Sequence, residues 1–541
     1  MNGSHSTPSH THACAMAVAG LLHDAGKLLQ PAKFPIDPQV ARLEQHICPT
    51  DRRTGRPTHL HALYTAQALE LARTDFGGLD RAAILRIASN HHRPSGDRFD
   101  EHLLQKADWL ASGHDRRTTD QDPDEADPIT ALAAIVRRVT WPADSQPSPV
   151  SNRAWCPTHE LAFNPESFLP GPAQDAEQYR RACETLSSRL IDGLATRYAD
   201  ADACVEGINA LASRLFHAVP SSRSRNQNPD VSLFDHSRLV AAFASCLAVQ
   251  YDGHNEPCDA DRIKGRFRLL AIGLGGIQDF IFRKLPQLDA GPGETGEKGL
   301  AKQLRARSFY ISLLTHLAAR RVLDWLGLPI VNLILDAGGR CLLLLPDEAS
   351  SVQRVRQAID FIQTWFFHNL AGSLRLDIGL SPVLTDNDFA AVGFPATYRA
   401  ADDLLAHARL TVPCPLLRDS GSWSKSGWVD SQESLPVDRA AFASKMKDFG
   451  RALPRSKFIA IDGDASDIEI LGYRIGLAGQ RPSAGRVLSL DVHETDVTTS
   501  VLITANHVPV ATEAEVHLLQ NHRAAEGDDL ADDETLHLQT S

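Results

Sequence analysis

Two adjacent pairs of metal-binding side chains stand out in the first hundred residues. His23 and Asp24 occur together in VAGLLHDAGKLLQP, a leucine-rich stretch with helix-like spacing, and His91 and His92 occur together in SNHHRPSG. An imidazole beside a carboxylate offers two good ligands for a hard or borderline divalent cation. Two such pairs in one region predict a metal centre.

Further ligands for the same centre are predicted on two other helical segments, HLHALYTAQ and QKADWLAS. Two divalent ions that share a carboxylate activate water against a phosphate ester and neutralise its developing charge. Asp24 is the natural bridge, because a carboxylate can span two ions, and Lys27 is placed to meet a phosphate oxygen. The predicted catalytic residues are therefore His23, Asp24 and Lys27. The predicted ligands are His23, Asp24, His61, His91, His92 and Asp108.

The segments that carry these residues predict a helical N-terminal region. HALYTAQALELA and RAAILRIASNHH have helical apolar spacing, and polar, proline-containing breaks follow at 118–128 and 141–152. From about residue 268, apolar strands and long amphipathic helices alternate in the order β-α-β-β-α-β, the ferredoxin-like split motif. Two short strands are expected beyond residue 395.

The predicted fold class is therefore α+β and multidomain. We expect a helical metal-binding domain, then a ferredoxin-like (palm-type) domain, then a small mixed α/β domain. The expected boundaries are 1–117 for the metal-binding domain, 118–262 for a linker and helical segment, 263–392 for the palm-type domain, 393–510 for the small domain and 511–541 for an acidic disordered tail.

Composition predicts a cytoplasmic chain with reduced thiols. Nine scattered cysteines without a C-x-x-C pair argue against a disulfide framework. The polar first residues contain no apolar signal segment, and no run approaches the roughly 18 apolar residues of a membrane span. The net charge of −12 argues against general nucleic-acid coating. A basic cluster is interpreted either as a solvated face or as a nucleic-acid-binding track, with Lys302, Arg305 and Arg307 as the contacts.

Several of these motifs resemble one known family. LLHDAGKL, HHRP and KADWLASG resemble the permuted HD nuclease domain that opens the large subunit of type III CRISPR effector complexes, the Csm type in particular. GGIQDFIF, LRARSFYISLLT and LGLPIVNLILDAGGRCLLLLP resemble the first palm domain of that family, and LPRSKFIAI resembles the end of its inter-palm domain. The resemblance runs through most of the chain in family order.

The resemblance implies a function and a set of partners. In such complexes, target RNA binding switches on the HD domain, which cuts single-stranded DNA with divalent metal of the Mn, Ni, Co or Mg class. The implied partners are the other complex subunits, guide and target RNA indirectly, and the single-stranded DNA substrate, with no membrane. The inter-palm domain of the family normally contains paired cysteines that bind zinc, but Cys414 stands alone here. We therefore expect no zinc knuckle.

The family also has a second palm, whose Gly-Gly-Asp-Asp hairpin makes cyclic oligoadenylate from ATP. EGDD at 526–529 lacks the flanking strands such a hairpin needs, and no acidic pair follows Gly338 and Gly339. We therefore expect no cyclic oligoadenylate synthesis by this chain alone. It would be the first half of a split or truncated large subunit, with the second palm on another chain or lost. ATP would bind only in a composite site, at Gly275, Gly276, Gly338 and Gly339.

Two alternatives remain at this point. The chain could be a catalytically silent scaffold of the same complex, using its palm and helices to bind neighbouring subunits. It could also be a standalone HD phosphohydrolase acting on nucleotides, which would leave the palm-like region without a role.

Overall fold

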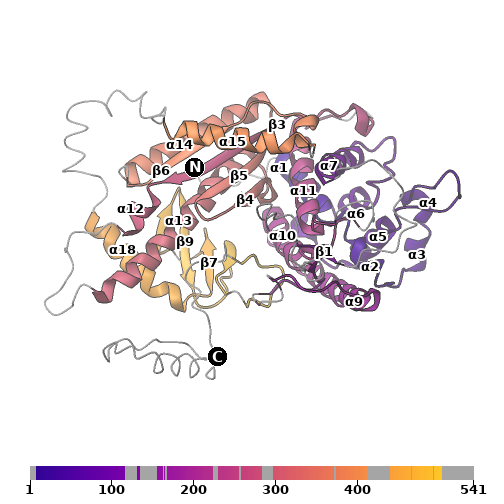
Figure 1. Cartoon of the computed structure of the whole chain (residues 1–541), viewed down its shortest axis with the longest axis horizontal. Helices are drawn as coiled ribbons and strands as arrows, with labels where there is room; N and C mark the ends of the chain where they lie inside the picture. The colour runs from indigo at the N-terminus through magenta and orange to yellow at the C-terminus, as the bar shows by residue number, and fades with distance from the viewer. Residues whose placement is uncertain are drawn as a thin grey trace, which may run out of the picture.

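The computed structural model describes most of the chain and places a helical region beside a region of antiparallel sheets (Figure 1). The predicted acidic tail, EGDD and Cys414 lie outside the described residues, as do parts of the 118–262 and 393–510 ranges. The described residues are 8–115, 131–134, 155–162, 164, 167, 169–222, 229–254, 258–282, 297–370, 373–390, 392–410, 439–464, 466–491 and 493–501.

Helices form the N-terminal region, as predicted, and a two-stranded ladder lies between two of them in the chain. The helices are α1 (Pro8–Leu22), α2 (Gly26–Leu29), α3 (Pro38–Ala41), α4 (Glu44–Ile47), α5 (His61–Leu71), α6 (Arg81–Ser89), α7 (Phe99–Asp115), α9 (Ala176–Gly193), α10 (Ala201–Phe216) and α11 (Leu233–Gln250), and the ladder strands are β1 (Leu132–Ala133) and β2 (Trp155–Cys156).

The central packing of this region is between α1 and α11. Small residues allow the two helices to approach closely, since a Cβ atom on Gly20 would lie only 2.6 Å from Cα of Ala241. Leucine, valine and phenylalanine side chains of both helices are fully buried in one hydrophobic core. The helical region therefore extends beyond residue 117. Its helix α11 comes from the range 118–262, which the sequence predicts to be a linker and helical segment.

The second region is built on a four-stranded antiparallel sheet with the order β4-β5-β3-β6. Two long helices connect its strands, so the chain follows the predicted β-α-β-β-α-β order and the α+β class is confirmed. The elements are β3 (Phe267–Gly275), α12 (Ile277–Phe282), α13 (Glu297–Leu326), β4 (Leu333–Asp336), β5 (Arg340–Pro346), α14 (Ala349–Leu370), β6 (Arg375–Leu380) and α15 (Phe394–Ala408).

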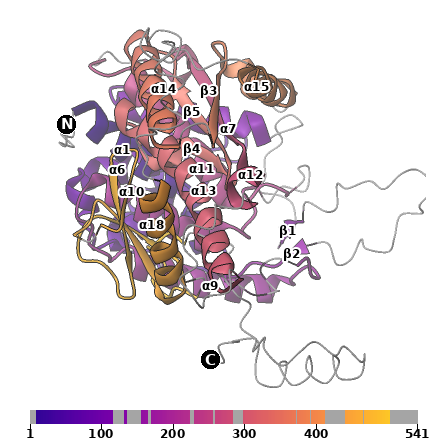
Figure 2. The same cartoon turned by 90° about the vertical axis from the view of Figure 1, so that its left-hand side faces the viewer.

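Both faces of this sheet are covered, which explains why β3 and β5 are almost continuously apolar. Successive side chains of a strand point to opposite faces. Leu270 and Ile272 of β3 join the core formed with α13 and α14, which lie in front of the sheet in Figure 2. Leu269 and Ala271 join the other core, together with α1 and α11. The sheet and the helical region therefore share one hydrophobic core.

A second four-stranded antiparallel sheet, with the order β10-β7-β9-β8, packs near α13. The sequence predicted two of its strands, β7 and β10, but not the hairpin of β8 and β9. The elements of this part are α18 (Arg439–Ala452), β7 (Phe458–Ile461), β8 (Ile468–Ile470), β9 (Tyr473–Ala478) and β10 (Arg486–Ser489).

Among the described residues, no helix is both long and apolar enough to cross a membrane. The 3-10 helices in the described part of the chain are η1 (Phe76–Gly78), η5 (Ala260–Arg262), η6 (Ile330–Asn332), η7 (Asp386–Phe389) and η8 (Leu453–Arg455).

Candidate metal centre

The turn between α1 and α2 places His23 and Asp24 inside the helical region, where both are almost completely buried. Thr65 of α5 fixes this turn, because its hydroxyl donates to the His23 carbonyl at 2.8 Å and accepts from the Gly26 amide at 3.0 Å. A Cβ atom on Gly26 would lie 1.9 Å from the carbonyl oxygen of His61. Glycine at this position therefore lets the turn reach the start of α5.

The two carboxylate oxygens of Asp24 face different sets of ligands. Oδ1 lies 3.2 Å from Nε2 of His61 and 3.8 Å from Nε2 of His91. Oδ2 lies 3.2 Å from Nε2 of His23 and 3.6 Å from Nε2 of His236. This is the geometry expected of a carboxylate that bridges two cation positions.

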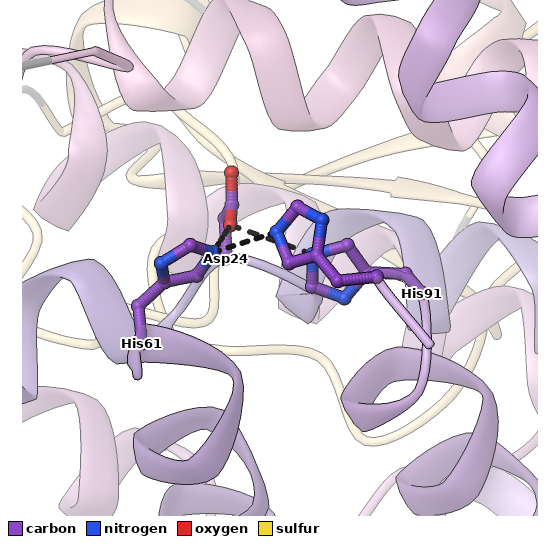
Figure 3. Close-up of side chains that lie close together, drawn as sticks. Asp24, His61 and His91 are labelled. Carbon is purple, nitrogen blue, oxygen red and sulfur yellow. Dashed lines mark hydrogen bonds and ion pairs between the residues drawn. The ribbon is translucent and has the colours of Figure 1, made fainter. Parts of the chain in front are cut away.

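The first ligand group consists of Asp24, His61, His91 and His92, whose ligand atoms all lie within 4.8 Å of one another. Figure 3 shows Asp24, His61 and His91 converging from three segments of the chain. His91 donates from Nδ1 to the Ala88 carbonyl at 2.7 Å, which directs Nε2 into the group. Nε2 of His61 and Nε2 of His92 are 2.9 Å apart. An imidazole that is fixed by a hydrogen bond at Nδ1 and directs Nε2 at other ligands, as in His91, is typical of metal ligands.

The second ligand group consists of His23, Asp108 and His236, again within 4.8 Å. Nε2 of His236 lies 3.2 Å from Oδ1 of Asp108, and Nε2 of His23 lies 3.9 Å from the same oxygen. His23 donates from Nδ1 to the Gly20 carbonyl at 2.8 Å, so its Nε2 also faces the group.

His236 was not among the ligands predicted from the sequence. It lies in SLFDHSRLVAAFASCLA, where the only local signal is a single histidine in a mostly apolar helical segment. Such a histidine is more often part of a core than a ligand, and nothing in its neighbours along the chain connects it to His23 or Asp24. The packing of α11 on α1 brings it into the centre.

A salt bridge to the palm region fixes the helix that carries Asp108. Lys106 of α7 pairs with Asp386 of η7, with Nζ and Oδ2 2.6 Å apart. The side chain of Lys106 is only 11% exposed, whereas that of Asp386 is 40% exposed, so solvent reaches the pair from the side of the carboxylate. The palm region therefore helps to position Asp108.

The charge states of the centre suit metal binding. Burial would raise the pKa of Asp24, but Lys27 and His23 beside it hold that pKa well below its usual range. Burial likewise opposes ionisation of Asp108, yet His236 lowers its pKa. Burial, reinforced by His23, lowers the pKa of His91 to about 3. Ionised carboxylates and neutral imidazoles are the forms that metal ions require.

Buried polar atoms that form no hydrogen bond also support a metal centre. Nε2 of His23, Nε2 of His91 and Oδ1 of Asp24 are buried and form no hydrogen bond within the described part of the chain. Such atoms cost free energy unless a ligand or ion satisfies them. A set of nitrogen and oxygen donors without sulfur suits Mn, Ni, Co or Zn ions, so the residues present fit one or two divalent cations.

Lys27 has two partners in the structure. Its Nζ lies 2.6 Å from Oδ2 of Asp24 and 2.7 Å from the carbonyl of Ser221. The predicted contact with a substrate phosphate would require the ammonium group to leave at least one of these partners.

The glycines predicted to bind nucleotide meet at one edge of the palm sheet. The Leu274 amide, at the end of β3, donates to the Gly339 carbonyl at 2.9 Å. Gly276 and Gly338 have φ angles of +83° and +63°, which favour glycine. The structure therefore places Gly275 and Gly276 beside Gly338 and Gly339, although nucleotide binding there remains a prediction.

The predicted nucleic-acid contacts on α13 differ in accessibility. Arg307 is only 7% exposed, and its guanidinium donates to the carbonyls of Phe280 and Ile281. It therefore ties α13 to α12 instead of facing solvent. Arg305 is half-buried, and the side chain of Lys302 lies outside the described residues.

The fold and the site together describe a helical region with a candidate metal centre, joined to antiparallel palm-like sheets. A model of the family described as Csm1 subunit domain B matches residues 266–411. The chain is 29% identical over 345 residues to a protein of Mycobacterium tuberculosis, covering 59% of this chain and 39% of that protein. It is 25% identical over 411 residues to a protein of Thermococcus onnurineus, covering 73% and 46%. Both relatives are named as single-strand-specific deoxyribonuclease Cas10/Csm1 of CRISPR subtype III-A.

Solved structures show the same fold. A Csm1–Csm4 cassette in complex with one ATP has a TM-score of 0.59 and 20% identity, covering 91% of this chain and 59% of that one. Csm1 of Thermococcus onnurineus has a TM-score of 0.57 and 21% identity, covering 88% and 56%. The chain is thus similar to part of Cas10/Csm1, and it spans less than half the length of the curated relatives described above.

Proposed function

We propose that the chain is the nuclease and scaffold part of a type III-A CRISPR large subunit and hydrolyses single-stranded DNA at its metal centre. The observation that carries this proposal is the position of Asp24, whose two oxygens each face one ligand group. The relatives' names supply the substrate class, and the His/Asp centre supplies the chemistry.

Each ligand group would bind one ion. His61, His91 and His92 would hold one ion against Oδ1 of Asp24, and His23, Asp108 and His236 would hold another against Oδ2. Divalent ions bound in this way supply an activated water and stabilise the charge that develops on an attacked phosphate. Lys27, which pairs with Asp24 in the structure, is the cation available to contact a phosphate oxygen.

The scaffold role is supported by the shared core and by solved structures of similar chains in Csm1–Csm4 assemblies. We extend this partner to the present chain, together with the other subunits of the complex and, through them, guide and target RNA. ATP would bind at the glycine-lined edge only with a second palm, supplied by another chain. The chain alone would then make no cyclic oligoadenylate.

The test uses the purified full chain after chelation and readdition of Mn²⁺, Ni²⁺ or Co²⁺. We expect cleavage of labelled single-stranded DNA that depends on the ion and is much slower on the matched duplex. Asp24→Ala should abolish cleavage and lower the bound metal. His407→Ala, an exposed histidine of α15, is the control and should change neither.

Three results would contradict the proposal. Undiminished cleavage in Asp24→Ala would place the activity elsewhere or in a contaminant. A folded wild-type chain that binds no divalent metal would instead support a silent scaffold. Hydrolysis of mononucleotides in preference to DNA would support the phosphohydrolase alternative.

A further inference from the structure

A third group of side chains that can bind a metal ion lies at the start of α1. It is separate from the centre formed by the two ligand groups around Asp24, which is called the HD centre below. It consists of His10, Cys14 and Asp202, whose ligand atoms lie within 4.8 Å of one another. His10 and Cys14 are one turn apart on α1, and Asp202 is on the first turn of α10. Nε2 of His10 is 3.3 Å from Oδ2 of Asp202 and 3.7 Å from Sγ of Cys14.

These separations match the edges of a tetrahedral zinc site. Bonds of about 2.3 Å to sulfur and about 2.0 Å to nitrogen and oxygen place neighbouring ligand atoms roughly 3.3 to 3.6 Å apart. The nitrogen–oxygen and nitrogen–sulfur distances are therefore already close to those around one ion, without movement of the backbone.

The second nitrogen of His10 is held in the way that metal-binding imidazoles usually are. Nδ1 lies 2.9 Å from the carbonyl oxygen of Gly327, the residue that follows α13. Donation to this carbonyl fixes the ring and turns Nε2 toward the thiol and the carboxylate. Gly327 has a φ angle of +69°, a backbone conformation that favours glycine.

Burial and charge are also suitable for zinc. Cys14 is completely buried, whereas the side chains of His10 and Asp202 are 15% and 25% exposed. Solvent can therefore supply a fourth ligand from the side of Asp202. A thiolate and a carboxylate together neutralise the ion, and the soft sulfur ligand selects zinc over magnesium or calcium.

The competing interpretation is a salt-bridge network without metal. Arg486 contacts Oδ2 of Asp202 at 3.3 Å, and the hydrogen bond between His10 and Asp202 raises the pKa of His10 to about 11. Burial also raises the pKa of the Cys14 thiol. An ion must therefore displace one proton from His10 and one from Cys14, and both protons go to solvent. Arg486 would remain paired in that case, since Asp324 lies 3.2 Å and Glu206 3.8 Å from its guanidinium.

We infer that His10, Cys14 and Asp202 form a zinc site, separate from the HD centre, that ties the start of α1 to α10 and to the end of α13. Its role is structural. It joins the helix that leads to His23 and Asp24 to the long helix of the palm region.

The test uses cobalt as a spectroscopic probe in the full chain. A thiolate bound to Co²⁺ gives a charge-transfer band in the near ultraviolet, and the HD centre cannot produce this band because its ligand groups contain no cysteine. We expect the band in the wild type and in Asp24→Ala. We expect its loss in Cys14→Ser and its retention in Cys183→Ser, a matched buried cysteine of α9.

A second measurement does not depend on cobalt. Zinc at equimolar concentration should raise the Tm of Asp24→Ala, in which the HD centre lacks its bridging carboxylate, and should not do so in the double variant Asp24→Ala/Cys14→Ser. Asp202→Asn should weaken zinc binding about tenfold or more while leaving the protein folded. A wild-type chain without the band, together with Asp24→Ala without a zinc-dependent Tm, refutes the site. A band that persists in Cys14→Ser also refutes it.

Discussion

Nε2 of His236, on α11, lies 3.6 Å from Oδ2 of Asp24, in the turn that follows α1, although the two residues are far apart in the sequence. The same nitrogen lies 3.2 Å from Oδ1 of Asp108. One imidazole of α11 therefore contacts both carboxylates of the centre, and the centre is complete only when α11 is packed against α1.

The first prediction concerns this imidazole. His236→Ala removes one of the three ligands of the second group, so we expect a loss of about one bound ion and a decrease in DNA cleavage on the order of a hundredfold. Metal analysis and cleavage assays provide the measurement. Ser237→Ala, its buried neighbour on α11, should leave both values unchanged. Wild-type metal content in His236→Ala would remove His236 from the ligand set.

The second prediction concerns Lys27, whose ammonium group is the nearest cation to Asp24 in the structure. Lys27→Met leaves the buried carboxylate without this partner, so the metal-free protein should lose about 2 kcal/mol or more of unfolding free energy. Metal should restore most of this loss, because the ion replaces the missing positive charge. Denaturant unfolding with chelator and with Mn²⁺ measures both values. An equal loss in the two conditions would contradict this assignment.

The third prediction concerns Asn332, a fully buried residue of η6 that joins α11 to the palm sheet. Its amide donates to the carbonyls of Ala242 and Leu344, and its oxygen accepts from the hydroxyl of Ser245. Asn332→Ala removes these three buried hydrogen bonds and should lower the unfolding free energy by about 2–4 kcal/mol. Asn369→Ala, on the exposed side of α14, should change it by less than about 0.5 kcal/mol. Similar values for the two variants would contradict the prediction.

The fourth prediction concerns pH. Burial, reinforced by the neighbouring His159, lowers the pKa of His217 to about 4 from its ordinary value of 6.5. The folded state therefore holds His217 neutral, while the unfolded state binds a proton below pH 6.5. The stability that this preference contributes is present above pH 6.5 and is lost as the pH falls toward 4.

His217→Gln should remove that part of the acid sensitivity. Relative to the wild type, we expect the loss of unfolding free energy between pH 7 and pH 4.5 to be smaller by about 1–2 kcal/mol. Urea unfolding across this range measures the difference. Parallel pH profiles for the two proteins would show that His217 does not titrate as its surroundings indicate.

Local sequence patterns were sufficient for much of the fold and for part of the centre. The His-Asp and His-His pairs are adjacent in the chain, so their proximity required no tertiary information. Continuous apolar runs predicted β3 and β5, because both faces of those strands are buried. The hairpin of β8 and β9 was missed because β8 has only three residues and charged residues interrupt the apolar runs of both strands.

Other features depend on contacts between distant segments, which residue spacing does not encode. The sequence alone determined the donor types and the helical and strand periodicities. Only the tertiary structure decided that His236 joins the centre, that the two oxygens of Asp24 face different ligand groups, and that Arg307 is buried. The physical reason is that helix packing fixes these positions, and packing depends on side chains from the whole core at once.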